Sequence, residues 1–238
     1  MTRAVGPDVS KYQMSFDPDH SVKQIDFVIQ RLSYGMIEDQ LRSRIWQGVE
    51  KISLRAAYHY YSTAVPWKEQ ADFFLSLAEG KGYRAFFVDY EHMYNHLTTQ
   101  TARDYKKMLD YIQGKYPQRK VLGYSGVYVY RDDLMPSKVN FSNYDWWFAR
   151  YPWLCNPQTS IPNLLILPEE RDWTFWQYTK TGPGHLYGCE WQYVDLNVYN
   201  GTKEELKKEW AGIVPPTPPV IDIREETITE CIDALKEL

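Results

Sequence analysis

The stretch FFVDYEH, residues 86–92, places two carboxylates directly behind an apolar run. The three apolar residues predict a buried β-strand, and Asp89 and Glu91 follow at its carboxyl end. Side chains alternate between the two faces of a strand, so positions two apart point the same way. Asp89 and Glu91 are therefore expected to stand together, an arrangement that costs electrostatic energy unless a site makes use of it.

On both sides of this stretch, short apolar runs of strand type alternate with helical patterns. Strands are predicted at residues 4–9, 27–32, 55–61, 85–90, 121–125, 146–149, 174–178 and 194–198. Such alternation favours a mostly parallel sheet with helices outside it. Because helical patterns become sparse after about Gly126, we expect an α/β fold: an irregular TIM-like β/α barrel with eight strands and fewer than eight helices.

Three helices are predicted from apolar residues at helical spacing. The clearest pattern is spaced i, i+3, i+4, i+7 and i+11, and Thr98 or Thr99 is its expected N-cap. Another follows Pro66, a residue favoured in the first turn of a helix. The three apolar stripes are Leu41, Ile45, Val49 and Ile52; Ala71, Phe74, Leu75 and Ala78; and Tyr105, Met108, Leu109, Ile112 and Tyr116.

The composition is that of one globular, mildly acidic chain. Its 238 residues, 44% of them hydrophobic, are enough for one sizeable core. The net charge is −4 and no basic stripe is visible, so nucleic acid is not an expected partner. No apolar run approaches the roughly 20 residues that span a bilayer, and the first ten residues lack the apolar segment of a signal peptide. We therefore expect no membrane insertion, and export either by another route or with the signal already removed.

Neither a metal site nor a disulfide framework is expected. Cys155, Cys189 and Cys231 form no C-x-x-C pair, so free thiols are favoured over a Cys155–Cys189 bridge. His92 and His96 have the i, i+4 spacing of zinc ligands, but the glutamate of the H-E-x-x-H motif is missing. We interpret both histidines as polar loop residues. No phosphate loop or dinucleotide fingerprint is present either, so no cofactor is expected.

The last part of the chain has the composition of a linker followed by an appendage. VPPTPPV, residues 214–220, contains four prolines and predicts an extended, semi-rigid segment. We therefore divide the chain into a barrel domain at residues 1–212, a linker at 213–222 and a short helix or tail at 223–238. Two heptads of apolar spacing in the tail favour a helix docked on the barrel or a frayed tail, and self-association or the stub of a further domain is the alternative. The apolar residues of the tail are Ile228, Cys231, Leu235 and Leu238.

Two further aspartates lie near predicted strands. Asp8 stands in AVGPDVSKYQ at the end of the first strand, and Asp195 stands in YVDLNVYNG near the last. A single aspartate at a strand end usually forms a turn or caps a helix. In β/α barrels, however, the carboxyl ends of the strands form the active face. We therefore expect Asp8, Asp89, Glu91 and Asp195 to meet at one barrel mouth.

Seven motifs, taken in order, resemble glycoside hydrolase family 25, the N-acetylmuramidase lysozymes. They are GPDVSKYQ, IQRLSYG with the later Asp39, AAYHYY, FFVDYE, WFARY, FWQY and VDLNVYNG, and the resemblance covers about residues 4–202. Each motif is short, and it is their combination that is specific. Two positions depart from the family pattern, because alanine precedes Tyr58 where glycine is common and Tyr60 replaces phenylalanine. Neither position carries a carboxylate.

The resemblance implies an irregular eight-stranded barrel with few helices. It also implies cleavage of the β-1,4 bond between N-acetylmuramic acid and N-acetylglucosamine in peptidoglycan, with Glu91 as general acid and Asp8, Asp89 and Asp195 in the same site. Glycoside cleavage needs a proton for the leaving oxygen and negative charge near the cationic carbon. Burial and neighbouring carboxylates are expected to keep Glu91 protonated near neutral pH. Attack by a carboxylate and attack by the substrate's acetamido oxygen both remain open, and the resemblance favours the second.

The aromatic share of 16%, with 20 Tyr and nine Trp, fits a carbohydrate groove as well as a bulky core. Flat rings stack on the apolar faces of sugars, although any single ring is more often a core residue. Arg31, at the end of the second strand, either neutralises part of the acid cluster or forms a structural ion pair. The predicted groove residues are Tyr58, Tyr60, Tyr124, Trp147, Trp176 and Tyr178.

Two other functions compete with the lysozyme hypothesis. A non-catalytic peptidoglycan-binding module would have lost a catalytic acid, whereas all four carboxylates are present here. A chitinase-like hydrolase would carry D-x-x-D-x-D-x-E, of which only the final D-x-E is found. We expect bacterial peptidoglycan glycan strands as the partner and the cell wall as the place of action. The setting is either a phage endolysin released through a holin-type pore or a secreted enzyme without its signal.

Overall fold

The computed structural model of the protein describes residues 2–91, 98–162 and 172–211. The predicted linker at 213–222, the predicted tail at 223–238, and His92 and His96 lie outside the described residues. Cys155 and Cys189 are free thiols, as predicted.

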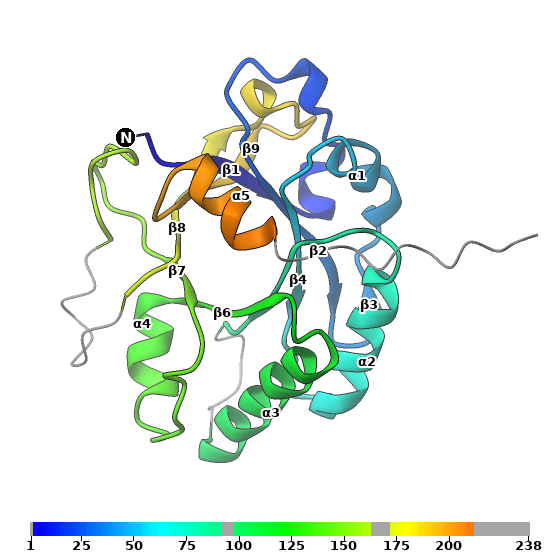
Figure 1. Ribbon diagram of the computed structural model, residues 1–238, viewed down its shortest axis with the longest axis vertical. Coiled ribbons are helices and arrows are strands. Elements are labelled where there is room, and N and C mark those ends of the chain that lie inside the picture. Colours follow the sequence, from blue (N-terminus) through cyan, green and yellow to red (C-terminus); the bar gives the residue numbers. More distant parts are fainter. Residues whose placement is uncertain (1, 92–97, 163–171, 212–238) are drawn as a thin grey trace, which may run out of the picture.

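Eight strands close into a barrel, which confirms the predicted fold class (Figure 1). Hydrogen bonds connect the ring in the order β1-β2-β4-β5-β6-β7-β8-β9, and β9 returns to β1. Neighbours are parallel except β9, which runs antiparallel to both β8 and β1. The strands are β1 (Val5–Val9), β2 (Val28–Tyr34), β4 (Arg55–Tyr60), β5 (Ala85–Asp89), β6 (Lys120–Gly126), β7 (Trp146–Ala149), β8 (Phe175–Pro183) and β9 (Tyr193–Tyr199).

One strand of the described chain was not predicted. β3 (Ile37–Glu38) is only two residues long and pairs antiparallel with the end of β2, outside the ring. A segment of this length leaves no alternation to recognise in the sequence.

The described residues contain five α-helices, so the expectation of fewer than eight is met over this part of the chain. The three predicted helices are present, and Thr98 caps the longest by accepting a hydrogen bond from the Thr101 amide at 3.2 Å. The helices are α1 (Arg42–Val49), α2 (Trp67–Ala78), α3 (Thr99–Lys115), α4 (Val127–Val129) with a π-helical continuation η3 (Tyr130–Leu134), and α5 (Lys203–Ala211). Short 3₁₀ turns are η1 (Lys11–Gln13), η2 (Pro18–His20) and η4 (Gly184–Tyr187).

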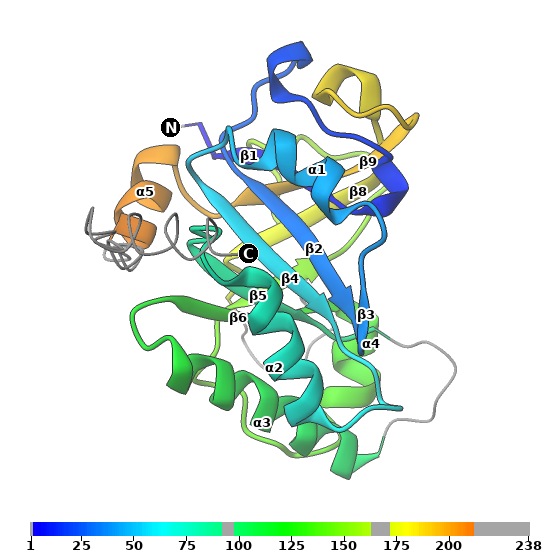
Figure 2. The same ribbon diagram turned by 90° about the vertical axis from the view of Figure 1, so that its right-hand side faces the viewer.

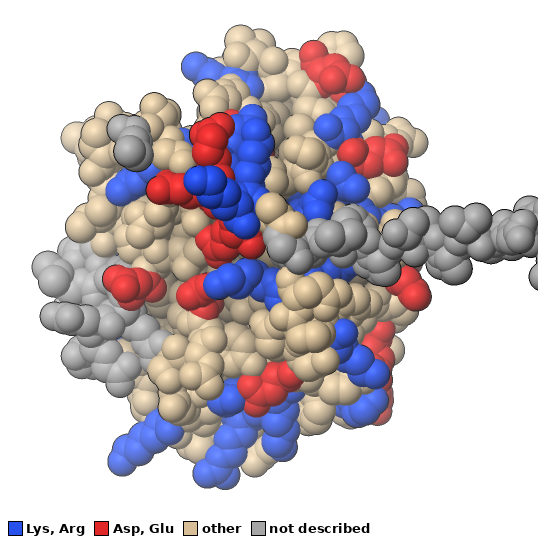
Figure 3. Space-filling view, in the orientation of Figure 1, with Lys and Arg blue, Asp and Glu red and all other residues tan. Residues whose placement is uncertain are grey.

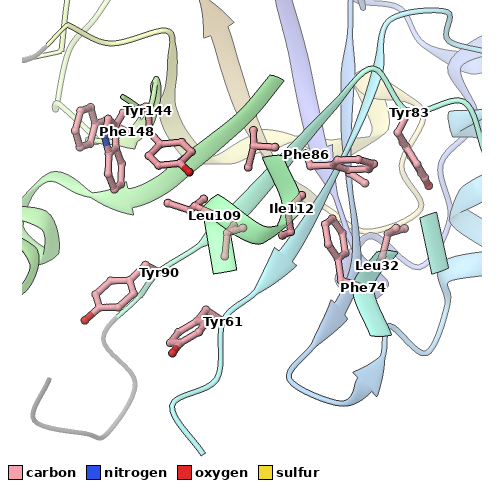
Figure 4. Close-up of a cluster of buried hydrophobic side chains, with 14 of the residues drawn as sticks. Leu32, Tyr61, Phe74, Tyr83, Phe86, Tyr90, Leu109, Ile112, Tyr144 and Phe148 are labelled. Atoms are coloured by element: carbon pink, nitrogen blue, oxygen red, sulfur yellow. The ribbon is translucent and has the colours of Figure 1, made fainter. Parts of the chain in front are cut away.

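The strands separate two apolar layers because their side chains alternate. On β5, Phe86 points outward into the layer beneath α2 and α3 (Figure 4), where its ring packs edge-on against Phe74. Phe87 points inward and packs against Phe175 inside the barrel. Helix α5 lies across one end of the barrel (Figure 2), and its Trp210 stacks on Phe175. The opposite end of the barrel, which α5 does not cover, can form a functional site.

Gly6 allows β1 to lie tightly against the start of β2. A Cβ atom at this position would come within 2.0 Å of the Phe27 carbonyl oxygen, so any larger residue forces the backbone to move. The close approach explains the glycine of the motif GPDVSKYQ. It fixes the position of β1, and therefore of Asp8, beside β2.

A buried network on the outer face of β4 holds the loop that follows this strand. Gln70 donates its amide hydrogens to backbone carbonyls, one of them of Ser62 at 2.9 Å, so its oxygen accepts from His59 Nε2 at 2.9 Å. His59 therefore carries its proton on Nε2 and accepts at Nδ1 from the Ser33 hydroxyl at 2.8 Å. Burial lowers the pKa of His59 to about 4, which keeps it neutral. The next residue, Tyr60, points the other way, toward the barrel mouth.

Charged side chains of both signs are interspersed over the face of the molecule seen in Figure 3. Across the three described ranges, no helix combines the length and apolarity that a membrane crossing needs.

Candidate active site

A cavity of about 310 Å³ opens at the barrel mouth, and all four predicted carboxylates line it. Asp89 is the last residue of β5, and Glu91 follows two positions later on the same side of the chain. Asp8 and Asp195 are direct cross-strand partners on β1 and β9. Three separate parts of the chain therefore bring their acids to one place, as the sequence predicted.

Asp195 reaches the mouth by a different route from the predicted one. The prediction treated it as one of several carboxyl-terminal strand ends. It instead lies near the start of β9, which runs antiparallel to both of its neighbours. Because β9 is reversed, its first residues and not its last ones reach the active end of the barrel.

Amide groups hold Asp8 and Asp195. Asp8 Oδ2 accepts from Gln177 Nε2 at 2.9 Å and from Asn197 Nδ2 at 2.8 Å, and Gln177 Nε2 is also 3.4 Å from Asp195 Oδ2. Burial raises the pKa of Asp8 to about 6 against the opposing effect of the two amides. Burial and then the charge of Asp8 raise the pKa of Asp195 to about 8. Of this pair, Asp8 is therefore the one that ionises first.

Asp89 and Glu91 also keep their protons to a higher pH than usual. Burial is the main cause of the raised pKa of Asp89, and the charge of Glu91 adds to it. Asp89 Oδ1 is buried and accepts no hydrogen bond from the described residues. The pKa of Glu91 is raised by burial, while a hydrogen bond from Tyr124 and the charges of Arg31 and Lys180 oppose the rise. Of the two causes expected from the sequence, burial and neighbouring carboxylates, burial is thus the larger cause of the raised pKa of Glu91.

The arrangement matches a general acid beside a negative charge. A buried carboxylic acid can donate a proton, and an amide-bound carboxylate can stabilise positive charge that develops in a substrate. Glycoside hydrolysis uses this combination. In the described part of the chain, no group of three or more His, Cys, Asp or Glu side chains is placed to hold a metal ion.

The sequence model of Glycosyl hydrolases family 25 matches residues 7–185. The chain belongs to this family. Among curated proteins, the uncharacterized protein YegX of Escherichia coli strain K12 is 32% identical over 222 residues, which cover 87% of this chain and 74% of YegX.

Solved structures agree with the family assignment. A family 25 glycosyl hydrolase from Bacillus anthracis is 26% identical, with a TM-score of 0.72 over 87% of this chain and 93% of the other. The lysozyme from Streptomyces coelicolor is 22% identical, with a TM-score of 0.69 over 90% of this chain and 100% of the other. The catalytic domain of endolysin ply40 from Listeria bacteriophage P40 is 21% identical, with a TM-score of 0.67 over 87% and 97%. The last two likenesses bear on the fold alone.

In this family 25 chain, Arg31 fills both roles considered for it. Its Nε donates to Asp39 Oδ2 at 2.7 Å in a largely buried ion pair, and its side chain lines the cavity. Its positive charge lowers the pKa of Asp8, Asp89 and Glu91 alike. Asp39 therefore anchors a cation that partly neutralises the acid cluster.

Four of the six predicted aromatic groove residues line the cavity, namely Tyr58, Tyr60, Tyr124 and Trp147. All four are buried, so they form its floor and walls. Trp147, for example, is held from below, because its Nε1 donates to Asn197 Oδ1 at 2.8 Å.

The placement of Trp176 and Tyr178 in the groove was wrong. Both point to the outer side of β8, where Trp176 is fully buried and donates Nε1 to the Arg150 carbonyl at 2.8 Å. Tyr178 packs against the same outer layer. Since side chains alternate, the residue between them, Gln177, is the one that faces the cavity.

The rings at the open rim and the amide that supports Asp8 were not predicted as site residues. The i, i+2 rule that joins Asp89 and Glu91 would have found Tyr193, which lines the cavity, and Asn197, which donates to Asp8, on either side of Asp195. Tyr12 and Trp191 lie outside the strands, so periodicity offered no signal for them. The exposed rings that line the cavity are Tyr12, Trp191 and Tyr193.

The Tyr124 hydroxyl lies within hydrogen-bond distance of two acceptors, one of them on Glu91. This hydroxyl lies 3.1 Å from Glu91 Oε1 and 3.0 Å from Gln177 Oε1, yet it has only one hydrogen to donate. When Glu91 is protonated, its own O–H can donate to Tyr124, whose hydrogen then goes to Gln177. When Glu91 has lost its proton, the tyrosine hydrogen can turn to the carboxylate. Tyr151, which also donates to Gln177 Oε1, holds the amide in both states.

Replacing Tyr124 with phenylalanine is therefore expected to move the alkaline limb of the pH profile of kcat to higher pH. The hydrogen bond from Tyr124 lowers the pKa of Glu91, so its loss raises that pKa and keeps the acid protonated longer. The maximal kcat should fall, because the carboxylate left after proton donation loses a donor. Tyr151→Phe is the matched control, since it removes a hydroxyl from Gln177 but none from Glu91. Equal shifts in both variants would contradict the role of Tyr124.

Proposed function

We propose that this family 25 protein is a lysozyme, an N-acetylmuramidase that hydrolyses the β-1,4 bond between N-acetylmuramic acid and N-acetylglucosamine in bacterial peptidoglycan. The observation that carries the proposal is the convergence of Glu91, Asp89, Asp8 and Asp195 on one cavity at the barrel mouth. Membership of a glycosyl hydrolase family supports the reaction class. The order of family motifs and the similarity to muramidase and lysozyme structures support the choice of polymer.

In the proposed reaction, Glu91 protonates the oxygen of the leaving sugar. Burial raises the pKa of its carboxyl group, so Glu91 holds its proton to a higher pH than an exposed glutamate, and Tyr124 stabilises the carboxylate that remains. Asp8 supplies negative charge, since two amide N–H groups favour its ionised form. Asp89 and Asp195 lie beside it and can ionise as positive charge develops on the substrate.

The cavity also fits a polymeric sugar. Exposed aromatic rings at its rim can stack on pyranose faces, while the polar wall offers hydrogen bonds to hydroxyl and acetamido groups. Two further hollows continue the cavity to either side, one sharing Tyr12, Arg31 and Tyr60 with it and the other sharing Glu91 and Tyr124. A strand that extends beyond a single sugar can therefore lie across the mouth. The place of action that we propose is the bacterial cell wall.

The test is digestion of purified peptidoglycan, followed by borohydride reduction and mass spectrometry of the products. Reduced muramic acid at the new ends is the expected result. Reduced glucosamine ends would show cleavage of the other glycosidic bond. Binding to the wall without any product would favour a non-catalytic module, and parallel digestion of chitin distinguishes a chitinase-like specificity.

A further inference from the structure

A second hollow adjoins the catalytic cavity. We call it the side groove; it has a volume of about 500 Å³ and lies between the end of β6, α4 and the end of β7. Glu91, Tyr124, Lys180 and Asp195 line both the groove and the cavity, so the two are continuous. A substrate bound at Glu91 can therefore extend from the cavity into the side groove.

Two cations without an ion-pair partner in the described part of the chain distinguish the side groove. The Arg150 guanidinium lies 4.7 Å from the centre of the Tyr128 ring, and the Lys180 ammonium lies 5.9 Å from that of Tyr151. Neither forms a salt bridge with a described carboxylate, although Glu91 and Asp195 line the same groove. The arrangement holds positive charge toward the open space, where it can meet an anion.

The acids that line the groove do not cancel this charge. Burial raises the pKa of Asp195 to about 8, so this carboxyl group is neutral at pH 7, and Glu91 can supply only one negative charge against the two cations. Tyr128 is further held by Arg131, whose guanidinium lies 5.2 Å from the ring centre and is itself paired with Asp132. The net charge that the groove presents is therefore positive.

The hollow on the other side of the mouth has a different electrostatic character. In the eight-membered ring, β2 lies four steps from β7, so this hollow is opposite the side groove. Its Arg31 is paired with Asp39, and its Glu38 is paired with Arg42, each at 2.7 Å. Lys11, whose ammonium lies 5.5 Å from the centre of the Tyr12 ring, is the one cation of this hollow without an ion-pair partner among the described residues. Mostly paired charges and exposed tyrosines suit a neutral sugar, so the two ends of the mouth are built for different parts of a substrate.

Peptidoglycan has both neutral and negatively charged parts. Its acetylated sugars are neutral, whereas the peptide stem on the lactyl group of muramic acid carries free carboxylates. We propose that the side groove binds carboxylates of the peptide stem, with Arg150 and Lys180 as the residues that select peptide-bearing strands. The inference rests on the proposed function, because it assumes that the polymer in the cavity is peptidoglycan.

The experiment compares two substrates that differ only in charge. Uncross-linked peptidoglycan strands are freed of phosphate-bearing polymers, and half of the sample has its stem carboxyls converted to neutral amides. KM and kcat are measured on both for the wild type, Arg150→Gln and Lys180→Gln. Lys11→Gln is the matched control, since it removes one positive charge from the opposite hollow.

The wild type is expected to have a lower KM on the strands with free carboxylates. Each side-groove substitution should raise that KM about two- to fivefold relative to the KM of the same variant on amidated strands, as for partly exposed charge pairs. The preference should also weaken with salt. Because Lys180 also acts on the catalytic acids, the ratio between the two substrates is the decisive quantity.

Four results would overturn the inference. Equal KM values of the wild type on the two substrates would show that the carboxylates are not recognised. A substrate ratio that is unchanged in both Arg150→Gln and Lys180→Gln would place recognition elsewhere. An equal loss of preference in Lys11→Gln would indicate general attraction by the protein's charge. A wild type inactive on both substrates would overturn the proposed function and this inference with it.

Discussion

Substitution of Glu91 with glutamine is expected to reduce turnover of peptidoglycan by on the order of 10²-fold or more while leaving the fold and substrate binding intact. Glutamine has the same shape, and its side-chain oxygen can still accept the Tyr124 hydrogen. It has no proton to transfer to the leaving sugar. Product formation is measured by mass spectrometry of reduced ends, and binding by retention on insoluble walls.

Glu69→Gln is a suitable control for this experiment. Glu69 lies on α2 and is exposed, so the substitution removes a glutamate carboxylate without touching the cavity. Turnover by Glu69→Gln should equal that of the wild type. If Glu91→Gln also turned over at the wild-type rate, another group would have to supply the proton, and the assigned role of Glu91 would be wrong.

Asp195→Asn is expected to make the protein more stable at neutral and mildly alkaline pH while impairing catalysis. Burial and the neighbouring Asp8 raise the pKa of Asp195 from its usual 3.8 to about 8. A group with a raised folded-state pKa gives its full contribution to stability below pH 3.8 and loses it as the pH rises toward 8. An uncharged asparagine avoids this loss. Allowing for solvent screening, we expect a gain of about 2 kcal/mol at pH 8, or roughly 4–8 °C in melting temperature.

The pH dependence distinguishes this explanation from a simple packing effect. Melting temperatures of the wild type and Asp195→Asn should nearly coincide at pH 4 and separate progressively up to pH 8. A constant difference at every pH would mean that the substitution acts through packing or hydrogen bonding. A variant that was less stable at pH 8 would show that Asp195 is better accommodated as an anion than its surroundings indicate.

Both substitutions concern a conflict between stability and catalysis in the carboxylate cluster. Four carboxylates in one buried cavity are unfavourable for folding, because each loses hydration and at least some repel one another. The raised pKa of Glu91 is a consequence of that environment and also lets this carboxylic acid remain a proton donor at a higher pH than an exposed glutamate. Substitution of a residue that only supports the fold is expected to lower stability, whereas Asp195→Asn is expected to raise it.

Much of the architecture follows from the sequence alone, for a physical reason. Strand and helix periods depend on local backbone geometry, so apolar spacing located the eight strands of the ring and the helices α1, α2 and α3. The same rule placed Asp89 and Glu91 on one side of the chain before any tertiary contact was known. Thr98 was recognisable as a cap because its hydrogen bond reaches only to Thr101.

Tertiary structure alone decided which face of each strand is inside and which way the last strand runs. The alternation of side chains along β8 predicts that Trp176 and Tyr178 share a face. Only closure of the barrel places that face outside and Gln177 in the cavity. Asp195 reaches Asp8 because β9 is antiparallel, a direction that its own residues do not encode locally. The positive side groove likewise arises from separate loops. Contacts between distant segments depend on the packing of the whole chain, whereas periodicity records only the neighbours of each residue along it.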